Sequence, residues 1–194
     1  MVYWIASRGE AGIDGISPTE SVTSRVEEQI EAAAEVGVSK VEFQDYPDGM
    51  IEYGLGLRRD ISRAIRIHRP DFVLIGNHRE LSGNGMFNMA DHRAVGLAGI
   101  DAIRDAANRW VFPDLDEEPW SGVRYTALLG SPISTHAVDI EKWFDAGVRA
   151  LLAHRTYLEY LGTTPEAAEA MLRKFAMDVA PRFDGRAGVA LEML

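Results

Sequence analysis

Two histidines and an aspartate lie around one predicted strand-to-helix connection near the middle of the chain. His78 follows the apolar run Phe72–Gly76, and Asp91 and His92 open the next helical stretch. A short continuous apolar run of this kind is typical of a buried parallel strand. Ligands bind beyond the carboxyl ends of strands in open α/β sheets, so the pattern predicts a site here. Imidazole and carboxylate groups bind divalent metal ions or transfer protons, and we expect one of these two chemistries.

Each histidine also has a structural interpretation. His92 is either a first-turn metal ligand or a surface histidine beside an aspartate that caps the helix. His78 either supplies an imidazole to the site or is bonded to the Gly/Asn-rich loop 82–85. His136 and His154 each lie in an apolar stretch, which indicates structural histidines with satisfied hydrogen bonds.

Composition limits the class of protein. The 194 residues, 46% hydrophobic and 26% charged, are ordinary for one globular domain, and we expect a single domain over residues 1–194. Without cysteine, a metal must be held by His, Asp or Glu, which favours zinc or a harder divalent ion. The net charge of -10 argues against nucleic acid and anionic membranes and favours a small uncharged or cationic ligand. The sequence shows neither a membrane span nor a signal peptide, so we expect a cytoplasmic protein. The four tryptophans are expected in the core rather than on a sugar-stacking surface.

Strand-like and helix-like stretches alternate along the chain. The expected strands are Val2–Ser7, Lys40–Gln44, Phe72–Gly76, Tyr125–Leu129, Thr135–Val138 and Gly188–Leu194. The expected helices are Pro18–Gly37, Leu57–His68, Asp91–Asn108, Trp143–Leu161 and Thr164–Val179. The apolar stripe of the first helix is expected at Val22, Val26, Ile30, Ala33 and Ala34. This alternation predicts a Rossmann-like, three-layer α/β/α sandwich with a mostly parallel sheet.

Several segments together resemble one enzyme family. They are Arg8–Gly12, Arg25–Glu28, Tyr46–Gly49, Ala90–Gly96, Asp101–Pro113 and Leu152–Tyr157. In this order and spacing they resemble the LmbE-like, PIG-L superfamily of zinc-dependent N-acetylglucosaminyl deacetylases, over nearly the whole chain. The resemblance implies a zinc-dependent hydrolase that removes an N-acyl (acetyl) group from an amino sugar or a related glycoside.

The resemblance also implies roles for single residues. His92 matches a zinc ligand of the family, and zinc lowers the pKa of its bound water towards ~7. His78 and Asp91 are the expected catalytic residues. Arg25 matches an arginine that contacts substrate, and Asp48 is the other expected substrate-binding residue. From the residues alone, Arg25 also fits a solvated helix face, and Asp48 also fits an Asx turn.

The sequence departs from the family pattern at two places. The His-Pro-Asp-Asp motif, which carries two of the three zinc ligands and the general base, is absent because Met1 begins where the family's second strand begins. Met89 and Ala90 replace the His and Pro of the second motif, so His78 is the candidate substitute for the missing acid. The chain is therefore expected to bind zinc weakly or not at all, to be inactive, and to associate through a gap in its sheet, as a homo-oligomer or an aggregate.

Two functions of different class follow. One is the deacetylase, with about forty further residues encoded upstream. The other is a catalytically inactive family remnant that binds a sugar-like ligand or a protein partner. An in-frame His-Pro-Asp-Asp codon run upstream of Met1 would favour the enzyme.

Overall fold

The computed structural model describes all 194 residues, which group into two compact units. The first unit comprises Met1–Gly49 and Ala137–Val189, and the second comprises Met50–His136 and Ala190–Leu194. The expectation of a single domain stays a prediction. None of the helices is long and apolar enough to cross a membrane.

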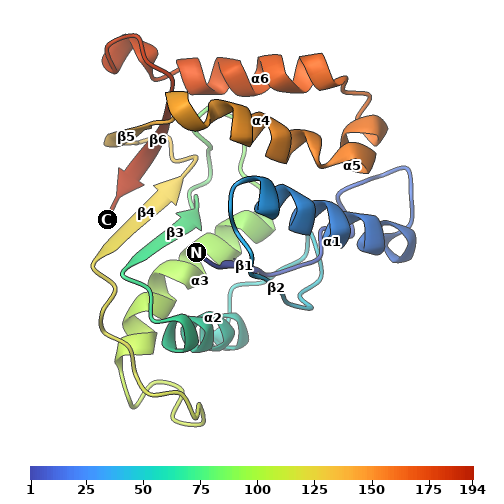
Figure 1. Cartoon of the computed structure of the whole chain (residues 1–194). Coiled ribbons are helices and arrows are strands. Elements are labelled where there is room, and N and C mark those ends of the chain that lie inside the picture. Colours follow the sequence, from blue (N-terminus) through green and yellow to red (C-terminus); the bar gives the residue numbers. More distant parts are fainter. The chain divides into compact units, whose positions relative to one another are not determined.

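The first unit combines a two-stranded sheet with a group of helices. β1 (Tyr3–Ile5) pairs in parallel with β2 (Val41–Phe43), and α1 (Pro18–Glu35) makes the crossover between them that parallel strands require. The later elements are η1 (Glu141–Trp143), α4 (Phe144–Leu152), α5 (Arg155–Tyr160), α6 (Pro165–Met177) and η2 (Ala180–Arg182). Figure 1 shows α4 between α1 and α6, and α4 contacts both helices. Phe144 and Val148 of α4 form a small buried core with Ala176 of α6.

The second unit contains most of a four-stranded sheet. Its elements are α2 (Leu55–His68), β3 (Phe72–Gly76), α3 (Ala90–Ala107) and β4 (Tyr125–Leu129), and the strands β5 (His136–Asp139) and β6 (Gly188–Met193) are divided between the two units. The strand order is β3-β4-β6-β5, so β3 is an edge strand, and the boundary between the units falls within β5 and β6. β3 and β4 are parallel, and β6 runs antiparallel to β4. α3 packs against β3, and α2 packs against α3 (Figure 1).

The α/β class and the mostly parallel pairing are confirmed. Every expected strand is present with ends that agree within two residues, and so are the helices other than Trp143–Leu161. The start of α1 shows why such local patterns succeed. The carboxylate of Glu20 accepts the backbone N–H of Ser17 at 3.1 Å, and Pro18 occupies the first helical turn, where a missing N–H costs nothing.

Four expectations about helices and burial are wrong. Residues 143–161 do not form one helix, because the backbone of His154 (φ -80°, ψ 58°) is not helical and separates α4 from α5. α1 buries Ser21, Glu28, Ala32 and Ala33, whereas Ile30 of the predicted stripe is 50% exposed. The strand β3 is not fully buried. Phe72 and Leu74 are 45% and 52% exposed, because both lie on the face of the sheet that α3 does not cover. Trp110 and Trp143 lie on the surface instead of in the core, at 81% and 72% exposure.

Candidate functional site

In the second unit, α3 approaches the end of β3 through a glycine. A Cβ atom at position 96 would lie 2.7 Å from the carbonyl oxygen of Gly76 and 3.0 Å from the Cα of His78. The backbone of His78 therefore lies against α3 at Gly96. His92 is one turn earlier on the same helix face, where Cβ atoms of residues four apart are about 5–6 Å from each other. The structure thus brings His78 and His92 to the same end of α3.

The three predicted residues at this end differ in exposure. Asp91 is 5% exposed, and its Oδ1 accepts the backbone N–H of His92 at 3.0 Å. A carboxylate in the first turn is also stabilised by the helix dipole. His92 is exposed, so its imidazole is open to a ligand. His78 is half-buried, and its Nδ1 is buried without a hydrogen-bond partner in the protein. Such an atom is uncommon in a folded protein.

The side-chain amides of Asn77 and Asn88 fix the connection that carries His78. The Oδ1 of Asn77 accepts the N–H of Arg79 at 2.9 Å, and its Nδ2 donates to the carbonyl of Leu81 at 2.7 Å. From the other end of the loop, Asn88 donates through Nδ2 to the carbonyl of Asn77 at 2.6 Å. These bonds hold the backbone on both sides of His78.

The side chain of Arg79 anchors the same connection to β6. Its guanidinium donates two hydrogen bonds to the carboxylate of Glu192, from Nη2 to Oε1 at 2.6 Å and from Nε to Oε2 at 3.2 Å. Glu192 is 5% exposed and also accepts the hydroxyl of Ser131 at 2.5 Å. The hydrogen bonds from Arg79, together with that from Ser131, lower the pKa of Glu192. The sequence carried a signal for this contact, because Glu192 is the one charged side chain in the apolar run Gly188–Leu194.

The side chains present do not fit a complete metal site. No group of three or more His, Cys, Asp or Glu side chains is placed to hold a metal ion. Structural and catalytic zinc sites both use at least three protein ligands. His92 with its neighbours falls short of that number, and we assign no chemical step to a metal here.

In the first unit, α1 presents a buried polar cluster around Arg25. The Arg25 side chain is 16% exposed, so the interpretation as a solvated helix face is wrong. Its Cζ lies 4.3 Å from the centroid of the Tyr157 ring, and its Nη1 lies 3.6 Å from Glu28 Oε2. Its Nε is buried without a hydrogen-bond partner. Arg25 is therefore held in place by the ring of Tyr157 and the carboxylate of Glu28.

His154 belongs to the same cluster. Its Nδ1 lies 3.5 Å from Arg25 Nη1. A guanidinium has only donor groups, so Nδ1 of His154 is the acceptor in this contact. Burial lowers the pKa of His154, the positive charge of Arg25 lowers it further, and Glu28 partly opposes the shift. The imidazole is therefore neutral at pH 7, with Nε2–H as its donor. Sequence reasoning took His154 as structural and did not anticipate its contact with Arg25.

Asp48 connects the loops that follow β1 and β2. Its Oδ1 accepts the hydroxyl of Ser7 at 2.6 Å, and its Oδ2 accepts the N–H of Ala11 at 3.1 Å. The backbone N–H of Asp48 donates to Glu10 Oε1 at 2.9 Å. Both carboxylate oxygens thus have protein partners, and the contributions of Ser7 and Glu10 were not apparent in the sequence.

The amino-acid sequence of this chain matches a known protein family. A family model described as PIG-L, GlcNAc-PI de-N-acetylase, matches residues 1–103, which is more than half of the chain. The chain belongs to the PIG-L family. A curated relative, diacetylchitobiose deacetylase of Thermococcus kodakarensis, is 33% identical over 105 residues. That alignment covers 53% of this chain and 38% of the relative, so the PIG-L chain matches well under two thirds of the relative's length.

Solved structures of low sequence identity share the fold of this PIG-L protein. N,N'-diacetylchitobiose deacetylase from Pyrococcus horikoshii has a TM-score of 0.87 at 22% identity, covering 100% of this chain and 72% of that one. The conserved protein TT1542 from Thermus thermophilus has a TM-score of 0.77 at 20% identity, covering 97% and 78%. GalB, the 4-carboxy-2-hydroxymuconate hydratase from Pseudomonas putida, has a TM-score of 0.76 at 16% identity, covering 98% and 82%. A deacetylase and a hydratase share this fold, so the fold alone does not fix the reaction.

Proposed function

We propose that the protein is a hydrolase that removes an N-acyl group, first of all acetyl, from an amino sugar or a related glycoside. The observation that carries this proposal is the PIG-L match over residues 1–103, supported by 33% identity to a diacetylchitobiose deacetylase. The matched range contains all five residues that the sequence singled out, which are Arg25, Asp48, His78, Asp91 and His92. A relationship across the site-bearing half of the chain supports a shared reaction better than a shared fold does.

The proposed reaction needs a proton donor for the leaving amine. Hydrolysis breaks the amide C–N bond, adds the hydroxyl of water to the carbonyl carbon and transfers a proton to the nitrogen. The imidazole of His78 is the proposed donor for that transfer, and the loop bonds around Asn77 hold the backbone that carries it. Asp91, buried beside His92, is the proposed proton acceptor from water. Arg25 and Asp48 of the first unit are the proposed substrate-binding residues, as the family resemblance implies.

The proposed reaction requires zinc, and this chain supplies one proposed ligand for it. His92 is the proposed ligand from this chain, and two or more further ligands are needed before zinc can activate water. The direct test measures acetate and free amine released from N,N'-diacetylchitobiose by the protein produced from its own chromosomal gene, together with its zinc content. Equimolar acetate and amine are expected. His78→Ala should lower the rate about 100-fold or more, as loss of a general acid does. His136→Ala, a change at another exposed histidine, should not alter it.

A second candidate is a family member that binds a sugar-like ligand without metal chemistry. The observation that favours it is the lack of any group of three metal-binding side chains. It predicts saturable binding of N,N'-diacetylchitobiose with neither acetate release nor bound zinc. The same experiment therefore separates the two functions.

A further inference from the structure

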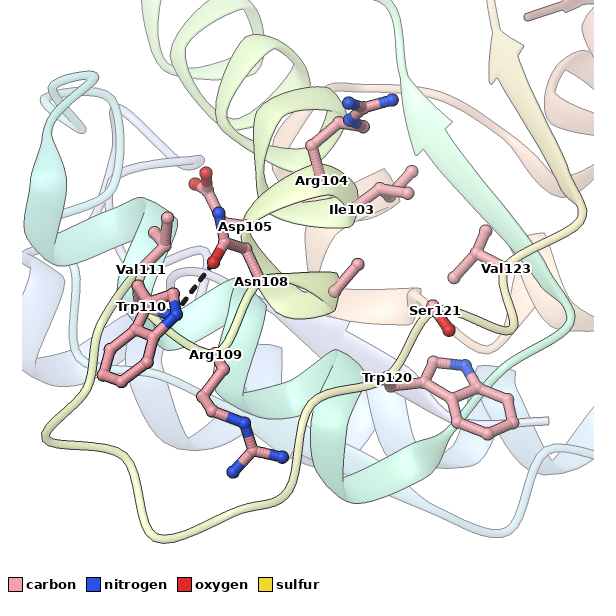
Figure 2. Close-up of a pocket in the computed structure, with 11 residues that line it drawn as sticks. Ile103, Arg104, Asp105, Asn108, Arg109, Trp110, Val111, Trp120, Ser121 and Val123 are labelled. Atoms are coloured by element: carbon pink, nitrogen blue, oxygen red, sulfur yellow. Dashed lines mark hydrogen bonds between the residues drawn. The ribbon is translucent and has the colours of Figure 1, made fainter.

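The second unit has an open pocket of about 810 Å³ at the carboxyl-terminal end of α3 (Figure 2). Its side chains come from the last turns of α3 and from the two ends of the loop that leads to β4; they include Arg104, Asn108, Arg109, Trp110, Trp120 and Ser121. Arg104 is twelve residues beyond His92, or about 18 Å along the helix axis at 1.5 Å per residue. The pocket is thus separate from the candidate catalytic end of α3.

Trp110 is the most exposed aromatic side chain of this pocket, and its loop is fixed. The backbone N–H of Trp110 donates to Asn108 Oδ1 at 2.9 Å, as the dashed line in Figure 2 marks. Arg66, only 4% exposed, donates to the carbonyls of Ala106 at 3.2 Å, Asn108 at 3.0 Å and Val111 at 2.9 Å. An 81% exposed indole on a braced loop is presented to solvent at little further entropic cost on binding.

Other arginines of α2 neutralise the acids of the same loop. Arg59 donates to Asp114 at 2.8 Å, and Arg63 donates to Glu117 at 2.8 Å. Arg58 pairs with Asp105 at the end of α3, also at 2.8 Å. The basic face of α2 is therefore largely used within the unit, and three acids around the pocket already have cationic partners.

The polar groups of the pocket that remain available are mainly donors. Arg104 is exposed and has no ion-pair or hydrogen-bond partner, and Arg109 makes only a 3.5 Å contact with Glu118. Trp120 is fixed as a wall, because its Nε1 donates to the carbonyl of Pro70 at 2.9 Å and Arg69 lies over its ring. In Figure 2 Arg109 extends between the two indoles.

We propose that this pocket is a second carbohydrate site, which binds an N-acetylated amino-sugar chain with one ring on the indole of Trp110. A sugar ring has an apolar C–H face that fits an indole and a rim of hydroxyl and amide oxygens that fits planar guanidinium donors. The volume lies within the ~300–1,000 Å³ usual for small-molecule sites. The choice of sugar rests on the proposed function. Unpaired Arg104 and weakly paired Arg109 disfavour the cationic deacetylated product, so the site distinguishes substrate from product.

The test follows the indole N–H signals of the four tryptophans by NMR during titration with tetra-N-acetylchitotetraose. A His78→Ala background keeps the ligand intact, and the Trp110 signal is assigned by its loss in Trp110→Ala. The Trp110 signal should shift and saturate, while that of Trp143, exposed to a similar degree, should not. In calorimetry, the Trp110→Ala change should weaken the site about tenfold or more, and Trp143→Ala should leave it unchanged.

The fully deacetylated tetramer should bind at least fivefold more weakly than the acetylated one. An unmoved Trp110 signal, an equal shift of Trp143, or equal binding of both tetramers would overturn the proposal. Acetate release is measured separately, so the two proposals fail independently. Binding at Trp110 without acetate release would support the second carbohydrate site and refute the proposed deacetylase activity. Acetate release without binding at Trp110 would refute only the second carbohydrate site.

Discussion

Gly96→Ala should destabilise the protein and disturb His78, although alanine is the better helix former. The new Cβ would lie 2.7 Å from the carbonyl oxygen of Gly76 and 3.0 Å from the Cα of His78, and both are backbone atoms that cannot rotate away. Overpacking of this kind costs about 1–3 kcal/mol or more. Replacing glycine within a helix returns about 1 kcal/mol. At the middle of the overpacking range the expected net loss in the free energy of unfolding is about 1 kcal/mol, and at its upper end about 2 kcal/mol.

The assay is chemical denaturation of Gly96→Ala beside a matched control, Gly147→Ala. Gly147 also lies inside a helix, but its new Cβ would meet only the Cδ2 atom of Leu172 in α6, at an ordinary 3.8 Å. The control should gain up to about 1 kcal/mol from helix propensity. Gly96→Ala should in addition lower the rate of acetate release, because it displaces the backbone of His78. Equal stabilisation by both substitutions would refute the close approach of α3 to the end of β3.

Three further outcomes are expected. Burial lowers the pKa of His154, so the native state binds fewer protons than the unfolded state. The melting temperature should therefore fall as the pH drops below 6.5. If His154→Gln showed the same pH dependence, this explanation would be wrong. Arg79 lowers the pKa of Glu192, so the stabilisation from this ion pair is present above pH 4.5 and is lost as the pH falls below it. Glu192→Gln should therefore lower the free energy of unfolding by about 1–2 kcal/mol at pH 7, measured by urea denaturation. A loss of the same size at pH 3 would be inconsistent with the ion pair. β3 is an edge strand and its Leu74 side chain is exposed, so the 194-residue chain should associate as its concentration rises in size-exclusion chromatography. Leu74→Lys should reduce this association, whereas Met86→Lys, at another exposed apolar residue, should not. An equal effect of both substitutions would show that β3 is not the surface through which the chain associates.

Local patterns predicted the elements that hold the candidate site. The β3 run and the start of α3 depend on hydrophobic periodicity and on neighbours in sequence, so their bounds were predicted to within a residue. The approach of α3 to His78 could not be read from Gly96 alone, because the close contact involves backbone twenty residues away.

Features set by distant partners were missed. α1 buries Glu28 because its carboxylate meets the N–H of Thr156, and no pattern within the helix reveals that partner. The break at His154 arises in the same cluster and interrupts a sequence that is otherwise helical in character. The exposure of Trp110 depends on a loop that Arg66 braces from another helix. Hydrophobic residue type predicts burial on average, and it does not identify an aromatic side chain that is presented to solvent.

N-deacetylation by this protein is measured by counting both products of the reaction. The protein made from its chromosomal gene is incubated with N,N'-diacetylchitobiose, and acetate, free amine and bound zinc are determined in the same preparation. We expect one free amine for each acetate, and loss of both acetate release and zinc in His92→Ala but not in His136→Ala. Saturable sugar binding without acetate from any N-acetylated amino sugar would contradict it and establish the inactive family member instead.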